Sequence, residues 1–417
     1  MKLQPPKGTR DFLPNDMEKR KWVFDRVRKV FELYGYEEIE TPAFESLELL
    51  TCKGSLGEEA VKDIYRFSDK SGRELGLRFD FTVPIARIVG TTTLPKPIRW
   101  FCIGKLWRYD DITKGRWREF SQAGIELIGA PGAGADAELL QVIIDCLLSF
   151  GLKDFVVRIN SRNILDSIAS ELGIKKTEAV FRMLDKLEKK GEDVIKEELQ
   201  KELSPDQITG LFDFIRMKKK IYTTELDEII KLLDEKYRKF VKIDLSIARG
   251  LDYYTGFIFE VVIKGAEGLG AVAAGGRYDN LIKKYGGNDT PATGFGIGVD
   301  RLMEVLEEKK LFKLPEKKTV YVIALCNEAK PTANMVCKEL RDADIAAELA
   351  LVERSLSNQL KYANSRDIPY AVIIGPKDMK EGKVTLRDMK TGEEKKIVIY
   401  EIVKEISLDN SNAEQCV

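Results

Sequence analysis

The chain has 417 residues, enough for two or three domains, and its 68 basic and 68 acidic side chains cancel, so no global field attracts nucleic acid. It contains no histidine, which excludes Ser-His-Asp and Cys-His nucleophilic sites and histidine-based metal sites. Six scattered cysteines predict reduced, mostly buried thiols, and the lack of any long apolar run predicts a cytoplasmic protein without a membrane span.

The N-terminal part predicts one helix followed by short strands. Residues 16–34 carry an apolar stripe at helical spacing, with Asp16 as the expected N-cap and Gly35 just past the end. Strands are expected over residues 36–40, 65–68 and 74–79, the last of which leads through Asp80 to a helix that contains Pro84. Strands joined by short turns indicate an α+β fold, an antiparallel sheet with helices on one side.

The stretch WRYDDITKGRWREFSQAGIE, residues 107–126, predicts two strands joined by a basic turn at Thr113 to Gly115. Alternation on the return strand sends Phe120, Gln122, Gly124 and Glu126 to one face and Glu119, Ser121, Ala123 and Ile125 to the other. Arginine pairs well with carboxylate and phosphate oxygens, so Arg108 and Arg116 indicate a site for a phosphate beside a small polar ligand. The alternative is a hairpin with a solvated charged face.

The middle of the chain changes character twice. Residues 160–240 are helical and heavily charged, with Pro205 in a first helical turn, and predict an inserted helical subdomain. Its lysines are expected to be solvated, with contact to nucleic acid as the alternative. The sheet is expected to resume over residues 243–248 and 257–263.

The C-terminal quarter predicts a separate domain. Residues 308–318 have the composition of a linker, and beyond them strands alternate with helices, which indicates a small α/β domain with a mostly parallel sheet. The polar end, residues 408–417, is expected to be a disordered tail.

Two later segments carry further candidate residues. Gly294, Gly296 and Gly298 lack the dinucleotide-binding spacing, and no P-loop motif occurs, but Arg301 near a helix start would suit a bound polyphosphate. Ordinary close packing of a strand on a helix is the alternative. In ARGLDYYTGFIFE, Arg249 could neutralise a second side of the phosphate held by Arg108. Tyr254, with Tyr278, could enclose a flat polar side chain, although tyrosines on strands more often pack in a core.

Four segments, WRYDDITKGRWREFSQAGIE, RGLDYYTGFIFE, GGRYDNL and GFGIGVDRL, resemble motif 2, the two histidine-binding motifs and motif 3 of the histidyl-tRNA synthetases, a family of class II aminoacyl-tRNA synthetases. PPKGTRDFLP and GYEEIETPAFE resemble the start and motif 1 of that family, and LKYANSRDIPYAVIIGPKDMKEGKVTLRDM resembles its anticodon-binding domain. The resemblance implies a class II antiparallel sheet with flanking helices. Its catalytic core would comprise residues 1–159 and 241–310, with a helical insertion at 160–240 and an α/β anticodon-binding domain at 319–407.

The resemblance also implies a reaction and its partners. The enzyme would activate L-histidine with ATP and Mg²⁺, without zinc or a metal held firmly by protein side chains, and transfer histidine to the 3′ end of tRNA(His). A homodimer with the first helix and strand at its interface is implied as well, although the apolar stripe of residues 16–34 would look the same on a helix that faces its own core.

Residue roles follow by position in the family's motifs. Arg108 would bridge the amino acid carboxylate and the α-phosphate, with Arg249 on the other side of that phosphate. Phe120 would stack on adenine near Asp110, and Arg116 and Arg301 would bind the terminal phosphates. The histidine pocket would contain Asp80, Thr82 and Gln122 around the ammonium group, and Glu126, Tyr253, Tyr254 and Tyr278 around the imidazole.

The chain departs from the family pattern at two places. Asp80 stands where many members have glutamate, and Asp111-Ile112 replaces a common Arg-Pro. Two other functions compete with the synthetase. One is the regulatory subunit of ATP phosphoribosyltransferase, which resembles the core but ordinarily lacks the anticodon-binding domain and erodes RGLDYY. The other is a nucleic-acid-binding accessory protein.

Overall fold

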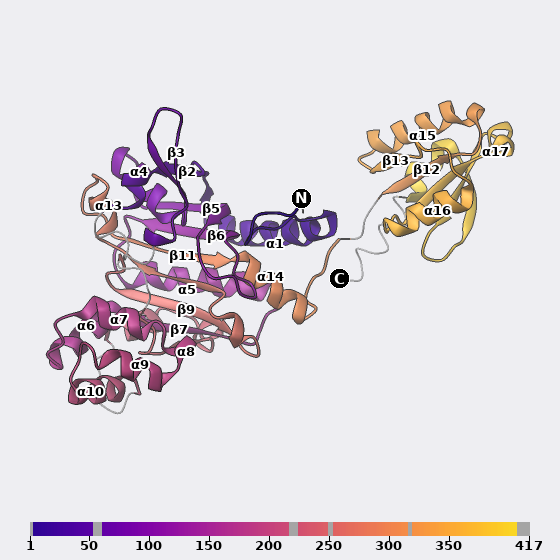
Figure 1. Cartoon of the computed structure of the whole chain (residues 1–417). Helices are drawn as coiled ribbons and strands as arrows, with labels where there is room; N and C mark the ends of the chain where they lie inside the picture. The colour runs from indigo at the N-terminus through magenta and orange to yellow at the C-terminus, as the bar shows by residue number, and fades with distance from the viewer. Residues whose placement is uncertain (1–2, 53–60, 217–223, 249–252, 316–318, 407–417) are drawn as a thin grey trace. The chain divides into compact units, whose positions relative to one another are not determined.

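The computed structural model describes residues 3–52, 61–216, 224–248, 253–315 and 319–406. The chain divides into two compact units between Leu314 and Pro315, and each unit is built on a large sheet of its own (Figure 1).

The large sheet of the first unit is antiparallel throughout its centre. Its strand order is β1-β5-β6-β11-β10-β9-β7-β8, and only the edge strands β1 and β8 run parallel to their neighbours. The strands are β1 (Glu37–Glu38), β5 (Ile98–Trp107), β6 (Glu119–Ile128), β7 (Phe155–Ser161), β8 (Val241–Ile243), β9 (Phe257–Ile263), β10 (Ala273–Arg277) and β11 (Ala292–Gly298). This arrangement confirms the antiparallel sheet expected from the sequence.

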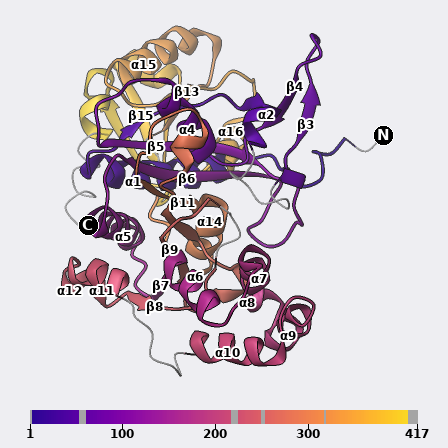
Figure 2. The same ribbon diagram turned by 90° about the vertical axis from the view of Figure 1, so that its left-hand side faces the viewer.

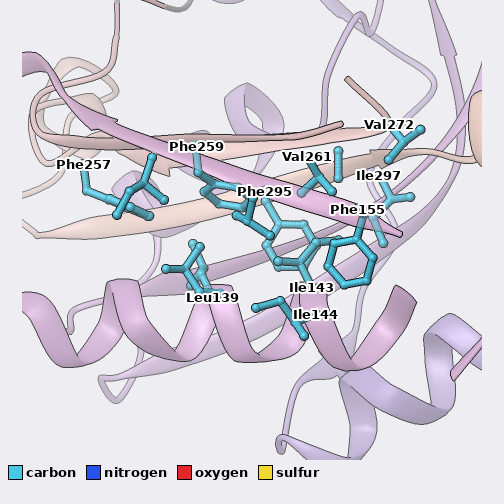
Figure 3. Close-up of a cluster of buried hydrophobic side chains, with 14 of the residues drawn as sticks. Leu139, Ile143, Ile144, Phe155, Phe257, Phe259, Val261, Val272, Phe295 and Ile297 are labelled. Atoms are coloured by element: carbon cyan, nitrogen blue, oxygen red, sulfur yellow. The ribbon is translucent and has the colours of Figure 1, made fainter. Parts of the chain in front are cut away.

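Helices cover both faces of this sheet. Helices α1 (Pro14–Leu33), α5 (Ala133–Ser149) and α14 (Val299–Glu308) pack on one face, where apolar side chains of α5 meet those of β7, β9 and β11 (Figure 3). The other face carries α4 (Thr82–Thr91), α13 (Leu281–Lys284) and α2 (Leu47–Leu50). A three-stranded sheet, β2 (Phe44–Ser46), β3 (Arg66–Ser68) and β4 (Glu74–Leu77), lies near them.

The expectation of helices on one side only is therefore wrong. Neighbouring residues of a strand face opposite sides, and β5 buries Phe101 in the cluster on the first face but Cys102 in the cluster on the second. Both faces of the sheet are apolar enough to need a cover.

Helix α1 begins two residues before the expected N-cap. Pro14 occupies the first turn, where its missing N–H costs nothing, and the Asp16 carboxylate accepts a hydrogen bond from the Leu13 backbone N–H at 3.2 Å. The stripe of Val23, Val27 and Phe31 is fully buried within the chain itself. It faces the protein's own core and is not available for an interface.

The insertion between β7 and β8 is helical, as the sequence predicts. Its elements are α6 (Arg162–Glu171), α7 (Thr177–Leu184), α8 (Leu187–Lys190), α9 (Glu192–Leu199), α10 (Pro205–Ile215), α11 (Thr224–Lys231) and α12 (Glu235–Arg238). Helices α6 to α10 group together, whereas α11 and α12 pack against α5 (Figure 2). Pro205 is the first residue of α10, and Ser204 caps that helix.

The strand expected at residues 243–248 ends almost at once. Strand β8 stops at Ile243, and the Asp244 carboxylate then accepts hydrogen bonds from the backbone N–H and the hydroxyl of Ser246. Such a local side-chain turn competes with sheet pairing. The first four residues of RGLDYY, 249–252, are outside the described part of the chain.

The second unit has a mixed sheet of order β13-β12-β14-β15-β16. Its elements are β12 (Val320–Ala324), α15 (Lys330–Asp342), β13 (Ala347–Leu349), α16 (Leu356–Ser365), β14 (Tyr370–Ile374), α17 (Pro376–Glu381), β15 (Lys383–Asp388) and β16 (Glu394–Val398). Only β12, β13 and β14 are parallel, because β15 and β16 return as antiparallel strands through short connections. The prediction of a mostly parallel sheet is therefore wrong for half of the strand pairs. The expected tail lies outside the described residues.

Cys102, Cys146 and Cys337 are buried, Cys52 and Cys326 are half-buried, and all five are free thiols, as expected. Among the described residues, no helix combines the length and the apolar character needed to cross a bilayer.

Candidate active site

The site is organised along one face of β6. Ser121, Ala123 and Ile125 point toward the face covered by α1, α5 and α14, whereas Phe120 packs with the cluster on the opposite face, and Glu126 bonds to side chains there. This is the alternation that the sequence predicts. Six residues of extended strand separate Phe120 from Glu126 by about 20 Å, enough for an extended small ligand.

Glu126 is a buried carboxylate held from two sides. The Thr82 hydroxyl, at the start of α4, donates to Oε1 at 2.6 Å, and the Tyr278 phenol donates to Oε2. Burial raises the pKa of Glu126 to about 8, against the two hydrogen bonds and with the help of the nearby Asp80 charge. A ligand N–H that reached this carboxyl group would stabilise its charged form.

Asp80 lies beside Glu126 and is only 4% exposed. Its Oδ1 accepts a hydrogen bond from the Val83 backbone N–H, but its Oδ2 is buried without a partner among the described residues. Burial raises the pKa of Asp80 to about 6, although Val83 and the positive charge of Arg108 oppose the shift. An unpaired buried oxygen is costly and suits a cationic donor from a ligand.

Three tyrosines stand around this pair of carboxyl groups. The ring of Tyr253 lies 4.8 Å from that of Tyr254 and 5.7 Å from that of Tyr278, measured between centroids. All three are at least nine-tenths buried. A pocket of about 280 Å³ opens at Tyr253 and Tyr254, and residues of the insertion, Arg162, Asp166 and Glu178, line its other side.

Arg108 and Phe120 lie together at the other end of the β6 face. Strand β5 ends at Trp107, so Arg108 is the first residue of the connection to β6 rather than part of a strand. Its Nε donates to the Phe79 carbonyl at 3.0 Å, and its guanidinium lies 5.2 Å from the centre of the Phe120 ring. Backbone bonding from Arg108 to Arg118 continues the pairing of the two strands.

The connection folds back on itself at the expected basic turn. Thr113 and Arg116 form a bridge around Lys114 and Gly115. Arg116 forms an ion pair with Asp110, so two residues that are expected at a nucleotide are paired with each other.

Arg301 reaches this turn from the third residue of α14. A Cβ on Gly115 would lie 3.0 Å from its Cγ, and its Nη1 donates to the Ala271 carbonyl at 2.6 Å. The structure therefore brings Arg116 and Arg301 to the same turn.

The glycines of β11 make room for β6 side chains. Gly294 is paired with Glu126, and a Cβ there would overlap the Glu126 carboxylate; a Cβ on Gly296 would lie 2.5 Å from the Gln122 amide nitrogen. Gln122 thus lies over Gly296. The G-x-G-x-G pattern was noted in the sequence, but its part in shaping the floor of the site was missed.

Arg249 lies outside the described residues, so its predicted place beside the phosphate is not described. Among the residues that are described, no group of three or more Cys, Asp or Glu side chains is arranged to hold a metal ion.

Sequence reasoning also missed the cluster behind the site. Arg20 of α1 donates to Asp300 at 2.8 Å and to the Ser121 hydroxyl, while Arg10 reaches the same Asp300 oxygen at 2.6 Å. The other Asp300 oxygen accepts from the Ser121 backbone N–H. The sequence did contain a hint of this cluster. Arg20 falls on the apolar stripe of α1, and a buried arginine requires an acidic or polar partner.

Comparisons with known proteins cover the whole chain. The histidyl-tRNA synthetase family model matches residues 8–302, and an anticodon-binding domain model matches residues 319–408. A histidine–tRNA ligase from Thermococcus kodakarensis is 43% identical over 97% of this chain and 98% of its own. One from Methanocaldococcus jannaschii is 39% identical over 96% and 98% of the two chains.

The chain belongs to the histidyl-tRNA synthetase family. The crystal structure of histidyl-tRNA synthetase from Nostoc shares its fold with a TM-score of 0.78 at 28% identity, over 98% of this chain and all of that one. A structure from Bacillus halodurans, described as an ATP phosphoribosyltransferase regulatory subunit/histidyl-tRNA synthetase, is similar with a TM-score of 0.71 at 25% identity over 86% of this chain and 96% of that one. The match to the Thermococcus kodakarensis ligase extends over both units of the chain.

Proposed function

We propose that this protein is a histidine–tRNA ligase that forms histidyl-adenylate from L-histidine and ATP and transfers histidine to the 3′ end of tRNA(His). The observation that carries the proposal is Glu126, a buried acceptor held by Thr82 and Tyr278 and placed to receive an imidazole N–H. A pocket built on such hydrogen bonds discriminates strongly against amino acids that cannot complete them.

The amino acid would lie along the β6 face with its ring at Glu126. Tyr253, Tyr254 and Tyr278 would surround the imidazole, and the unpaired Asp80 oxygen, with Thr82 and Gln122, would receive the ammonium group. Asp80 is shorter than the family's usual glutamate, but its position beside Glu126 supports a contact between its carboxylate and the ammonium group.

The nucleotide would occupy the opposite end. Phe120 would stack on adenine near Asp110, Arg108 would bridge the substrate carboxylate and the α-phosphate, and Arg249 would hold that phosphate from the other side. Arg116 and Arg301 would bind the terminal phosphates with Mg²⁺. The proximity of Arg108 to Phe120, and of Arg301 to the Thr113–Arg116 turn, supports this order.

This site can perform the chemistry without a protein base. A carboxylate oxygen of histidine attacks the α-phosphorus of ATP, and the bond to the departing pyrophosphate breaks. A terminal ribose hydroxyl of tRNA then attacks the carbonyl carbon, its proton passes to a phosphate oxygen, and AMP leaves. Positioning and neutralisation of charge by guanidinium groups supply most of the acceleration.

We further propose a cytoplasmic homodimer. The α1 stripe gives it no support because that stripe is buried within the chain. Phe44 and Phe67 offer a better surface, since both are about half exposed and their rings meet at 5.8 Å on the small sheet.

The test is ATP–pyrophosphate exchange with each of the twenty amino acids. Exchange that depends on L-histidine alone is expected, whereas a regulatory subunit or an accessory tRNA-binding protein would show none. The E126A variant should lose histidine-dependent exchange, and the surface variant E197A, on α9 of the insertion, should retain it.

A further inference from the structure

Behind the histidine pocket, Arg277 ends β10 and is almost completely buried, at 6% exposure. Sequence reasoning singled out its neighbour Tyr278 and gave Arg277 no role. Because adjacent residues of a strand face opposite sides, Tyr278 points to Glu126 while Arg277 points to α5 on the other face of the sheet.

All five N–H groups of the Arg277 guanidinium have an acceptor within reach. Nε and Nη2 donate to the two Asp136 oxygens at 3.0 and 2.9 Å, and Nη1 donates to Asp279 at 3.1 Å. The remaining acceptors are the backbone carbonyls of Ala130 and Gly132. Only arginine has enough donors in this fork geometry to fill such a set.

The same network fixes the backbone on both sides of Tyr278. The Asp279 carboxylate also accepts from the Ala292 backbone N–H, and the Asp279 N–H donates to the Thr255 hydroxyl, both at 3.0 Å. Tyr278 itself donates its backbone N–H to the Ala292 carbonyl at 2.8 Å. Residues 277–279 are therefore tied to α5, to β11 and to Thr255, which follows Tyr254.

We infer that Arg277 is a positioning residue for histidine recognition: clamped by Asp136 and Asp279, it sets the place of the Tyr278 hydroxyl and through it the orientation of Glu126. It touches no substrate. This inference rests on the proposed function, because it assumes that Glu126 receives the imidazole.

The clamp predicts a selective defect. In R277K the charge remains but the fork is lost, so Tyr278 should shift and the KM for histidine should rise about tenfold or more, since small displacements of positioning groups are costly. The KM for ATP should stay within about twofold, because Phe120 and Arg108 lie at the far end of β6. D279N, which leaves the Arg277–Asp136 pair intact, should act in the same direction.

A mutant cycle separates positioning from general support of the fold. If Arg277 acts through the Tyr278 hydroxyl, R277K/Y278F should be no worse for histidine than Y278F alone. The matched control is R99K, because Arg99 also joins a strand of this sheet to α5 through a two-pronged bond, to Glu138 at 3.1 and 2.9 Å. The R99K substitution should change the KM for histidine only slightly, and in the double variant R99K/Y278F the two effects on this KM should multiply.

Multiplicative effects of R277K and Y278F, or equal rises of both KM values, would overturn the inference. If R277K does not fold, as thermal melting would show, D279N with Y278F gives the same cycle. Absence of histidine-dependent exchange by the wild-type protein would instead contradict the proposed function, so the two failures are distinguishable.

Discussion

Glu126 is the side chain of the site whose burial is most unfavourable for its charged form. It is buried, its pKa is raised to about 8, and Asp80 with a pKa near 6 lies beside it. Two carboxyl groups in one apolar pocket are an arrangement that folding alone would not favour. They are expected where a ligand supplies the missing positive and donating groups.

The raised pKa predicts how stability changes with pH. A proton is bound by folded Glu126 up to about pH 8, but by an unfolded glutamate only up to its ordinary value of 4.5. Stability from this group is therefore complete below about pH 4.5 and is lost as the pH rises toward 8. Wild type should lose stability relative to E126Q across this range, by an amount on the order of a few kcal/mol.

Melting temperatures of the two proteins at pH 5 and pH 8.5, without ligand, test this. Asp80 titrates in both proteins and its charge contributes to the raised pKa of Glu126, so the difference between them reports Glu126 together with its coupling to Asp80. A difference that does not change with pH would show that Glu126 titrates at an ordinary value in the folded protein.

Among the elements, strand β11 shapes the site through its glycines, which leave space for side chains of the neighbouring strand. Gly294 and Gly296 leave space that Glu126 and Gln122 fill from the neighbouring strand. Gly275 of β10 is crowded in the same way, with the Phe295 Cβ at 2.5 Å from the place of a Cβ. The floor of the pocket is bare backbone because the adjacent strand supplies the functional groups.

The variant G294A should disable histidine recognition while leaving most of the fold in place. A methyl group would displace the Glu126 carboxylate, and a shift of about 1 Å in such a group costs on the order of 100-fold in kcat/KM. Exchange kinetics with varied histidine measure the effect. The control is G134A on α5, where a Cβ would meet nothing within 4 Å; equal activity of the two variants would contradict the proposed packing.

The sequence was most informative where periodicity and position agree. The bounds of β9 match those expected, and the faces of β6 follow from simple alternation. It was less informative where long-range contacts decide. The pairs Arg20–Asp300 and Arg277–Asp136 each join residues more than 100 positions apart, and no local pattern encodes them.

Two other predictions failed, on the strand at residues 243–248 and on the parallel sheet of the second unit, and each has a physical reason. Residues 244–248 are apolar enough for a strand, but Asp244 and Ser246 form their own turn. In the second unit, alternation of strands and helices suggested parallel pairing, and the direction of β15 depended on how α17 returns the chain. Motif resemblance, rather than periodicity, provided the residue roles.

On the scale of the whole molecule, each unit has its own apolar core. The clusters of the first unit lie within residues 23–306, and those of the second within residues 320–406. Binding of amino acid and nucleotide is assigned to the first unit alone. The second matches a family model for anticodon binding.

Residues 1–314 alone should therefore fold and retain histidine-dependent exchange within a few-fold of the full chain. Charging of tRNA(His) should fall by about 100-fold, because a second linked binding module contributes an effect of this size. Both assays on the same preparation provide the comparison, with residues 315–417 melted separately as the folding control. An unfolded or exchange-inactive fragment would show that the two units depend on each other.

The ion pair between Arg116 and Asp110 has a consequence for the choice of anion. Asp110 occupies one side of the guanidinium, so an anion that binds there would compete with an internal carboxylate. A single weakly held anion would gain little from that exchange, whereas in the proposed binding mode a triphosphate would already be held at Arg108 and Arg301. If Arg116 binds ATP as proposed, the turn would favour ligands that make several contacts at once.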